Sequence, residues 1–436
     1  MAFGLAGLLP AHAAEPVPWG EIPNLWKKPV TPEDTTAPPD TAAREALTKP
    51  RPKSGLARLG PLEFFPRATV SALFDDNIEI QKTNQQSDVI WTLSPAVMMV
   101  GGNPGVELPR GITFEGLRML PRQPYIGLDA EPAKMLLLDY APSYQLFTDH
   151  DKYNALNHSA LFTGIYSLSR LTLGADVDFR KTSDTVGDVG RRITSQELSA
   201  RLTTKYDLSD RTCVQVNGEY RDMSYDDARL TGSRQWVNQN WINRQLSGKI
   251  NAGLGLTLGY WDVDRFPSQT FEQLLLRGIY RFAEKMDVTL AVGGEYRQSG
   301  GGGSATLDPV VMLAGSYRPV DATSFTLEAH RQQHTSPTYG NQNYTLTGFS
   351  GGVRQRLGEK WHVSLNGGYD MVDYRATVSG VTASRSDDYF SVRVGVDYQF
   401  AERWTSGAYH VYRRNSSNTG YGYDNNQFGV QVSWRF

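Results

Sequence analysis

From Pro66 to the end of the chain, apolar and polar residues alternate along runs of about ten to fourteen positions. In the run 390–400 every even position is apolar or aromatic, whereas Ser391, Arg393 and Asp397 stand between them. Successive side chains of a strand point to opposite faces, so each run has one apolar face and one polar face. Repeated along a chain, this pattern is typical of an outer-membrane β-barrel, which presents one face to lipid and the other to water.

The runs predict an all-β protein: a single antiparallel transmembrane β-barrel of about eighteen strands. Short turns follow every second strand and longer polar connections follow the others. Since barrels of this class keep their short turns in the periplasm, we expect an even strand number and both termini in the periplasm. In the weakest run Arg244 falls out of register, which predicts a β-bulge. The predicted strands cover residues 66–78, 87–100, 134–147, 155–168, 170–180, 194–207, 211–224, 235–250, 253–263, 270–283, 287–299, 304–318, 322–334, 342–357, 361–373, 384–400, 404–415 and 423–436.

Three segments depart from the barrel pattern. Residues 1–14 have an apolar core and an A-x-A cleavage pattern but no basic start, which predicts a truncated signal peptide. Residues 15–65 are rich in proline and cannot bury enough apolar surface to fold, so we expect a disordered periplasmic tether before the barrel of residues 66–436. A Gly- and Pro-rich insertion at 101–133 takes the place of a short turn. It would plug the lumen, bind a partner or remain disordered.

Composition narrows the classes of protein that fit this pattern. The net charge is −2, with 44 basic and 46 acidic residues, so nothing indicates a nucleic-acid partner. No run approaches the length of an apolar spanning helix, which leaves a barrel as the structure that could cross a bilayer. The single cysteine, Cys213, excludes an intramolecular disulfide and a multi-cysteine metal site.

The end of the sequence carries a second signal. Val430, Val432, Trp434 and Phe436 alternate up to the last residue, and a closing strand with a terminal Phe resembles the signal read by the outer-membrane assembly machinery. Aromatic residues also recur at predicted strand ends, where they form belts at the two membrane interfaces. At the periplasmic ends they are Tyr206, Phe282, Tyr317, Trp361, Phe400, Trp404 and Phe436, and at the opposite rim Tyr220, Tyr260, Tyr296, Trp91 and Phe390.

Motifs of the first four strands carry a resemblance to a family. They are Phe65-Pro-Arg-Ala-Thr-Val-Ser-Ala-Leu-Phe-Asp-Asp-Asn-Ile78, then Ser87-Asp-Val-Ile-Trp-Thr-Leu-Ser-Pro95, and Tyr140-Ala-Pro-Ser-Tyr-Gln-Leu-Phe-Thr-Asp149 with Asn157-His158. With these motifs the chain resembles an outer-membrane β-barrel porin family often associated with exopolysaccharide biosynthesis and export operons. The resemblance implies a barrel of about this strand number that lets a secreted polysaccharide leave the cell. The insertion at 101–133 departs from the short turn expected in that family.

The strand assignment also predicts which charged residues line the lumen. A charged lumen favours solutes of one sign, but with both signs present neighbouring charges can simply pair across strands. Near the periplasmic ends basic residues outnumber acidic ones, which suggests an anionic solute. The predicted lumen-lining residues are Arg180, Arg201, Arg221, Arg277, Arg297, Arg354, Arg356, Arg393, Arg435, Asp176, Asp178, Glu219, Glu295 and Asp397.

Catalytic and metal-binding interpretations are weaker. His158 and Ser159 are adjacent, so they face opposite sides of a strand and cannot act as a pair; we expect no enzyme activity and no cofactor. The group at Asp149-His-Asp151 is more simply a solvated loop than a metal site. Asp75-Asp76-Asn77 more simply shapes the first loop through side-chain hydrogen bonds to the backbone than binds Ca²⁺.

The sequence therefore predicts a channel in the outer membrane of a Gram-negative bacterium. The first interpretation is a conduit for export of a secreted polysaccharide. The alternatives are a general or selective diffusion porin for small solutes, or a plugged structural protein. Expected partners are outer-membrane lipid and lipopolysaccharide, the assembly machinery and components of polysaccharide secretion.

Overall fold

The computed structural model describes residues 57–103, 134–282, 285–302 and 305–435. The predicted signal peptide, most of the predicted tether and most of the insertion at 101–133 lie outside these residues. No helix in the described part of the chain has the length and apolar character needed to cross a membrane.

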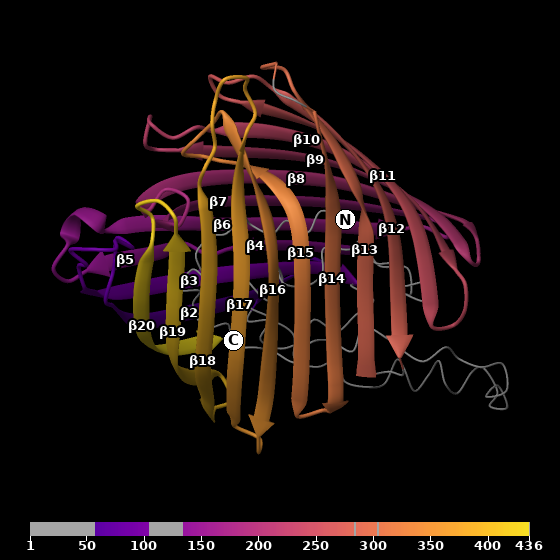
Figure 1. Ribbon diagram of the computed structural model, residues 1–436. Coiled ribbons are helices and arrows are strands. Elements are labelled where there is room, and N and C mark those ends of the chain that lie inside the picture. Colours follow the sequence, from indigo (N-terminus) through magenta and orange to yellow (C-terminus); the bar gives the residue numbers. More distant parts are fainter. Residues whose placement is uncertain (1–56, 104–133, 283–284, 303–304, 436) are drawn as a thin grey trace, which may run out of the picture.

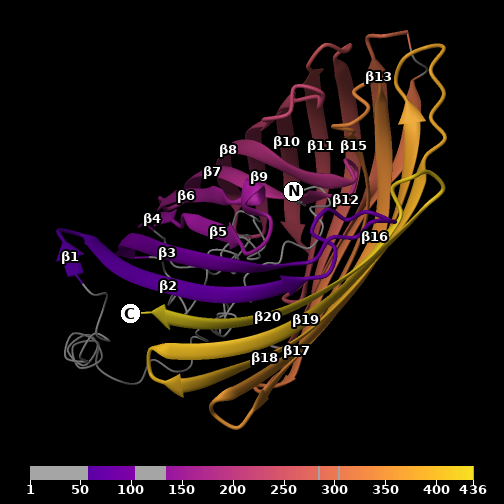
Figure 2. The same ribbon diagram turned by 90° about the vertical axis from the view of Figure 1, so that its left-hand side faces the viewer.

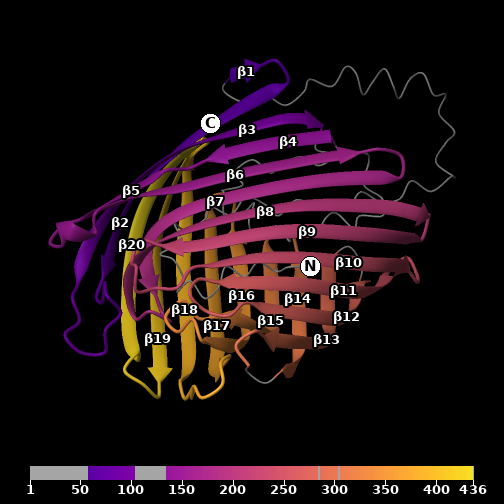
Figure 3. The ribbon, with the colours of Figure 1, turned by 90° about the horizontal axis from the view of Figure 1, so that it is seen from above.

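The described chain is an all-β, closed antiparallel barrel, in which each strand pairs with its neighbours in chain order (Figures 1 and 3). The strands are β1 (Ala57–Leu59), β2 (Leu62–Asp75), β3 (Asp88–Asn103), β4 (Lys134–Tyr140), β5 (Ser143–Phe147), β6 (Ala155–Ser167), β7 (Leu171–Val186), β8 (Arg191–Ser209), β9 (Thr212–Tyr225), β10 (Ser233–Gln245), β11 (Ile250–Val263), β12 (Gln269–Phe282), β13 (Met286–Ser299), β14 (Thr306–Val320), β15 (Thr323–Thr335), β16 (Gln342–Leu357), β17 (Trp361–Ala376), β18 (Ser386–Ala401), β19 (Trp404–Ser417) and β20 (Tyr423–Arg435).

These elements form eighteen strand positions around the barrel wall. β1 pairs with β2 as a short hairpin, and β4 and β5 share one position between β3 and β6. The break between them contains Pro142, which has no backbone N–H to donate to a neighbouring strand. The predicted eighteen-strand barrel is confirmed.

The barrel closes where the first long strand, β2, pairs with the last, β20 (Figure 2). A buried polar network stabilises this seam. The Asp75 carboxylate, 1% exposed, accepts hydrogen bonds from Asn425 Nδ2 at 2.6 Å, Gln427 Nε2 at 2.7 Å and the Asn77 N–H at 2.9 Å. Arg413 in turn donates to Asn425 Oδ1 at 2.6 and 2.9 Å. Asp75 therefore shapes the first loop, as expected from its sequence.

The observed strands follow the predicted ones closely, with three differences. The predicted strand 134–147 is divided into β4 and β5. β2 begins at Leu62 and β1 lies before it, so strand structure extends into the range assigned to the tether. The bulge predicted at Arg244 is wrong, because β10 keeps a continuous register with β9 and β11 and ends at Gln245. Arg244 lies at the end of the strand on its exposed face, where a charged side chain reaches water.

The two faces of the wall differ as the alternation predicts. On β12, Leu274 and Leu276 are each 60% exposed. Leu275, which lies between them, and Arg277, which follows Leu276, are buried. An exposed apolar face is what lipid requires of a barrel exterior. Exposed aromatic residues of the two predicted belts lie on this outer face: Tyr206, Phe282, Tyr317, Trp361, Phe400 and Trp404 at one end, and Trp91, Tyr260, Tyr296 and Phe390 towards the other.

The two ends of the barrel differ in their connections. The turns 168–170, 210–211, 321–322, 358–360 and 402–403 are two or three residues long, and we call this the short-turn end. β2 begins and β20 ends there. The other end, the long-loop end, carries among others the segments 76–87, 226–232, 336–341, 377–385 and 418–422.

Candidate functional site

The fourteen predicted lumen-lining residues all occupy positions that face the inside of the barrel in the structure. On their strands they alternate with exposed apolar residues, as Arg201 does with Leu202 and Arg393 with Val394. The buried face of a closed barrel is its interior. The residues concerned are Arg180, Arg201, Arg221, Arg277, Arg297, Arg354, Arg356, Arg393, Arg435, Asp176, Asp178, Glu219, Glu295 and Asp397.

Several of these charges pair with each other. Arg201 on β8 donates to Glu219 on β9 at 2.6 and 3.1 Å. On single strands, Arg297 lies 2.6 Å from Glu295 and Arg180 lies 3.3 Å from Asp178. Arg221 pairs with Glu197 at 2.8 Å, and Asp176 accepts a hydrogen bond from Thr163 at 2.9 Å. Pairing therefore accounts for a large part of the charge on this wall.

Towards the short-turn end the wall is basic. Three arginines, Arg354, Arg393 and Arg435, act electrostatically on one carboxylate, Asp397. Asp397 also receives a hydrogen bond from Gln431. A surplus of fixed cations favours anions in the space that they face.

Arginines of the inner wall also stack on aromatic rings. The guanidinium carbon lies 4.1 Å from the ring centre in the pair Arg277 and Trp241, 4.3 Å in Arg297 and Trp261, and 4.2 Å in Arg393 and Tyr409. Trp261 faces inward. Tyr412 faces outward, since its strand places Val411 and Arg413 inside.

The first loop of the long-loop end folds into the barrel mouth. Ile78 and Ile80 are 0% and 2% exposed, although their loop is polar in sequence. Ile80 packs against Tyr389 and Tyr423, which face inward on β18 and β20. Ile80 has φ of 50°, a strained conformation for a β-branched residue. The strain indicates that packing holds this loop inside the mouth.

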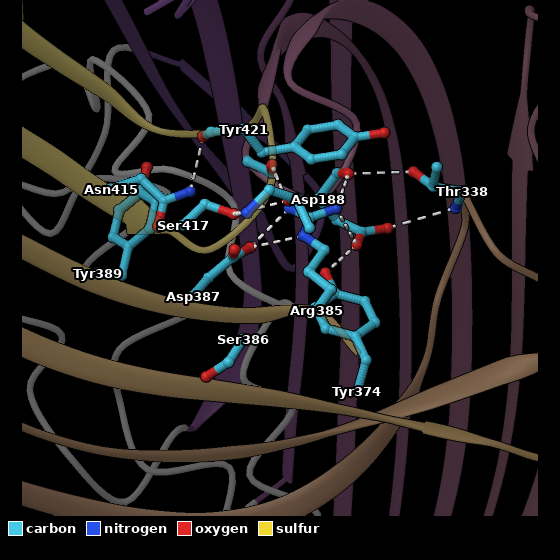
Figure 4. Close-up of polar contacts among 12 residues, drawn as sticks. Asp188, Thr338, Tyr374, Arg385, Ser386, Asp387, Tyr389, Asn415, Ser417 and Tyr421 are labelled. Atoms are coloured by element: carbon cyan, nitrogen blue, oxygen red, sulfur yellow. Dashed lines mark hydrogen bonds and ion pairs between the residues drawn. The ribbon is translucent and has the colours of Figure 1, made fainter. Parts of the chain in front are cut away.

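A second loop crosses the mouth and binds the opposite wall (Figure 4). Asp188, between β7 and β8, accepts hydrogen bonds from Ser336 Oγ at 3.0 Å, from the Thr338 N–H at 3.3 Å and from the Tyr374 hydroxyl. Arg385 donates to the Asp188 carbonyl at 2.8 Å and lies 3.4 Å from its carboxylate. β7 and β8 stand nearly opposite β15–β18 around the wall. We call these five residues the Asp188 bridge.

Arg385 is itself fixed by further contacts. It donates to Asp387 at 2.6 and 2.9 Å, and its guanidinium carbon lies 3.8 Å from the centre of the Tyr421 ring. Burial and the hydrogen bond of its hydroxyl with Tyr339 raise the pKa of Tyr421 to about 12. Gly190 has φ of 70°, and a Cβ there would lie 2.6 Å from the Tyr421 ring, so this loop requires glycine.

The neighbouring loop 226–232 contacts the loop that carries Asp188. Arg191 pairs with Asp227, and Arg229 lies 2.8 Å from the same carboxylate. Hydrogen bonds from Arg229 and Arg191 hold the pKa of Asp227 well below its usual range. Arg265 donates to the Leu230 carbonyl at 2.7 Å. Several loops of the long-loop end are thus connected with one another.

The sequence did not predict the Asp188 bridge. Its members lie up to 197 residues apart in the chain, and all but Tyr374, which lies on β17, come from polar loops without periodicity. Of the residues predicted to form the assembly signal, Val430 and Val432 are exposed on the outer face of β20. Phe436 lies outside the described residues. Recognition of the assembly signal stays a prediction. In the described part of the chain no three His, Cys, Asp or Glu side chains are arranged to hold a metal ion.

A closed barrel with an apolar exterior, aromatic belts and a charged interior defines an outer-membrane β-barrel protein. Residues 244–436 match a family model described as outer membrane protein beta-barrel domain. That match agrees with the expectation of a Gram-negative outer-membrane protein without enzyme activity. No curated protein matches the chain significantly.

Solved structures with a similar outline have low identity to the chain. OccAB4 of Acinetobacter baumannii is 9% identical with a TM-score of 0.43, over 86% of this chain and 98% of that one. OpdQ of Pseudomonas aeruginosa is 9% identical with a TM-score of 0.43, over 86% and 97%. OccK2 (OpdF) of Pseudomonas aeruginosa in complex with glucuronate is 11% identical with a TM-score of 0.43, over 87% and 99%.

Proposed function

We propose that the protein is a diffusion channel that carries small polar solutes across the outer membrane. The observation that supports this most directly is the closed barrel of eighteen strand positions whose inner face is charged and hydrogen-bonding. Barrels of about 16–18 strands are wide enough to hold an aqueous channel. The first loop and the Asp188 bridge narrow the long-loop mouth, which favours small solutes over polymers.

The basic wall near Asp397 supports a preference for anions. Fixed cations lower the energy of an anion inside the channel and raise that of a cation. We therefore expect purified protein in planar bilayers to give discrete conductance steps, with a reversal potential in a KCl gradient that shows chloride selectivity. Folded protein that gives no steps contradicts the channel, and clear potassium selectivity contradicts the anion preference.

Export of a secreted polysaccharide is the narrower candidate. It is supported by the resemblance of the first four strands to barrels associated with exopolysaccharide operons. The two functions differ in a deletion strain: loss of polysaccharide secretion supports export, whereas normal secretion together with swelling of liposomes in small sugars supports diffusion.

We further propose that the short-turn end faces the periplasm, which places both ends of the barrel domain there. Short turns and long loops of such barrels are usually divided in this way. An epitope inserted in the loop 418–422 is expected to bind antibody on intact cells, and one in the turn 358–360 only after the outer membrane is permeabilised. The opposite labelling would reverse the orientation.

A further inference from the structure

Two asparagines lie on the lipid-facing side of β10, below the aromatic belt of the long-loop end. Asn238 is exposed and Asn240 is half-buried. Trp236, the preceding residue on this face, packs between Tyr220 and Tyr260 of the belt, with ring centres 5.3 and 5.7 Å away. The two amides therefore lie deeper than the belt, at the level of the lipid acyl chains.

The neighbouring strands carry no polar side chain at this depth of the outer face. β9 and β11 pair with β10 on its two sides (Figure 3). The four residues directly opposite the two asparagines are apolar or glycine: Val216, Gly218, Leu256 and Leu258. A Cβ added at Gly218 would have no neighbour within 4 Å, so there is open space beside Asn238. β10 thus presents two amides within an otherwise apolar band.

The two amides satisfy only part of their hydrogen-bonding capacity within the chain. Asn240 Nδ2 donates to Asn238 Oδ1 at 2.6 Å, and Asn238 Nδ2 donates to the Asn217 carbonyl at 3.2 Å. A carboxamide has two N–H donors and one carbonyl acceptor. One N–H of each amide and the Asn240 Oδ1 therefore have no partner among the described residues. Acyl chains offer no hydrogen bonds, so these groups are costly against lipid and favour contact with protein.

We propose that Asn238 and Asn240, with the open space at Gly218, form the contact surface between two copies of this chain in the membrane. A carboxamide both donates and accepts hydrogen bonds, so it is complementary to a second carboxamide. A two-fold axis along the membrane normal brings residues of equal depth together, and each asparagine then meets the asparagines of the second copy. The missing side chain at Gly218 lets the second copy approach closely, as small residues do at contacts within membranes.

Oxidative cross-linking in isolated outer membranes tests this contact. The chain first receives Cys213→Ser, which removes its buried native thiol. Asn238→Cys in that background is expected to form a disulfide-linked dimer when copper phenanthroline is added. Val430→Cys is the matched control and should remain monomeric, because Val430 is 57% exposed on the lipid-facing side of β20, which lies nearly opposite β10 in the ring.

Co-purification of two differently tagged copies, expressed together, tests whether the amides hold the contact. Wild-type copies are expected to co-purify after mild detergent extraction. The double change Asn238→Leu and Asn240→Leu should reduce recovery of the second copy about tenfold or more, since it removes every hydrogen bond across the contact. Leucine is favourable against lipid, so this variant should fold, which its heat-dependent migration on gels checks. Gly218→Leu keeps both amides but fills the open space, and it should also reduce recovery.

Three results would overturn the contact: no disulfide-linked dimer of Asn238→Cys, equal cross-linking of Val430→Cys, or unchanged co-purification of the double leucine variant. A disulfide-linked product of a mass other than twice that of the chain also contradicts a second copy, and indicates another membrane protein as the partner. None of these measurements depends on conductance, so their outcome is independent of the proposed channel function.

Discussion

Replacing Asp188 with alanine is expected to widen the channel mouth and raise the single-channel conductance. The carboxylate accepts hydrogen bonds from Ser336 and Thr338 of the loop 336–341 and from Tyr374 of β17, on the side of the barrel opposite its own loop. Without the carboxylate, the loop between β7 and β8 loses these three hydrogen bonds and keeps only those that Arg385 and Thr338 donate to its backbone carbonyls. The mean open conductance, or the fraction of time spent in the larger conductance state, should increase.

The size of this effect follows from the hydrogen bonds that are lost. Bonds to a charged group contribute about 1.5–3 kcal/mol each. Because water solvates the freed donors when the mouth opens, we expect the closed–open equilibrium to shift by the equivalent of one to two such bonds, about 3 kcal/mol. That corresponds to a change of roughly a hundredfold in the ratio of closed to open mouths. Asp188→Asn keeps the size of the side chain and should have an intermediate effect.

A matched control is Asp210→Ala, which removes an exposed carboxylate from a short turn at the other end of the barrel. It should conduct as the wild type does. If Asp188→Ala and the control give the same conductance as the wild type, the bridge does not limit the passage of ions.

Replacing Asp75 with alanine is expected to cause the largest loss of stability among single changes at the seam. The carboxylate is buried and accepts hydrogen bonds from Asn425 and Gln427 across the junction of the first and last strands. Two buried amide donors lose their acceptor, at about 1–3 kcal/mol each, so the free energy of unfolding should fall by about 3 kcal/mol. Urea titration, with gel migration of the folded form as the readout, measures this free energy.

Asp388→Ala provides the comparison for the seam. Asp388 is an exposed carboxylate on β18 that accepts a hydrogen bond from Tyr369 at the surface. Loss of the Asp388 carboxylate should lower the free energy of unfolding by well under half as much as Asp75→Ala does. An unchanged midpoint for Asp75→Ala would show that the seam depends on backbone pairing and not on this network.

The sequence predicted the wall of the barrel well because each strand records its environment in alternate residues. The lipid-facing and interior positions of β18 follow directly from the run 390–400. Local chemistry explains the two places where the strand prediction was wrong. Pro142 divides one predicted strand in two, and Arg244 lies at a strand end where no bulge is needed.

The mouth could not be predicted in the same way. Loops have no periodicity, so nothing in the sequence indicates that Asp188 meets Thr338 and Arg385. Likewise the pattern places Arg277 inside the barrel, but it does not show that Arg277 lacks an acid while Arg201 has one. Those facts depend on which strands are neighbours and where each side chain reaches.

The seam between β2 and β20 also has a consequence for biogenesis. Its partner residues, such as Asp75 and Gln427, are separated by 352 positions, so the ring is completed by its most distant contacts. Until β20 arrives, the free edge of β2 can pair with a strand of another molecule. Contacts this distant in sequence form slowly and leave partly assembled chains prone to aggregation. A cell that makes this protein therefore benefits from a chaperone that shields the first strand until synthesis and export of the last are complete.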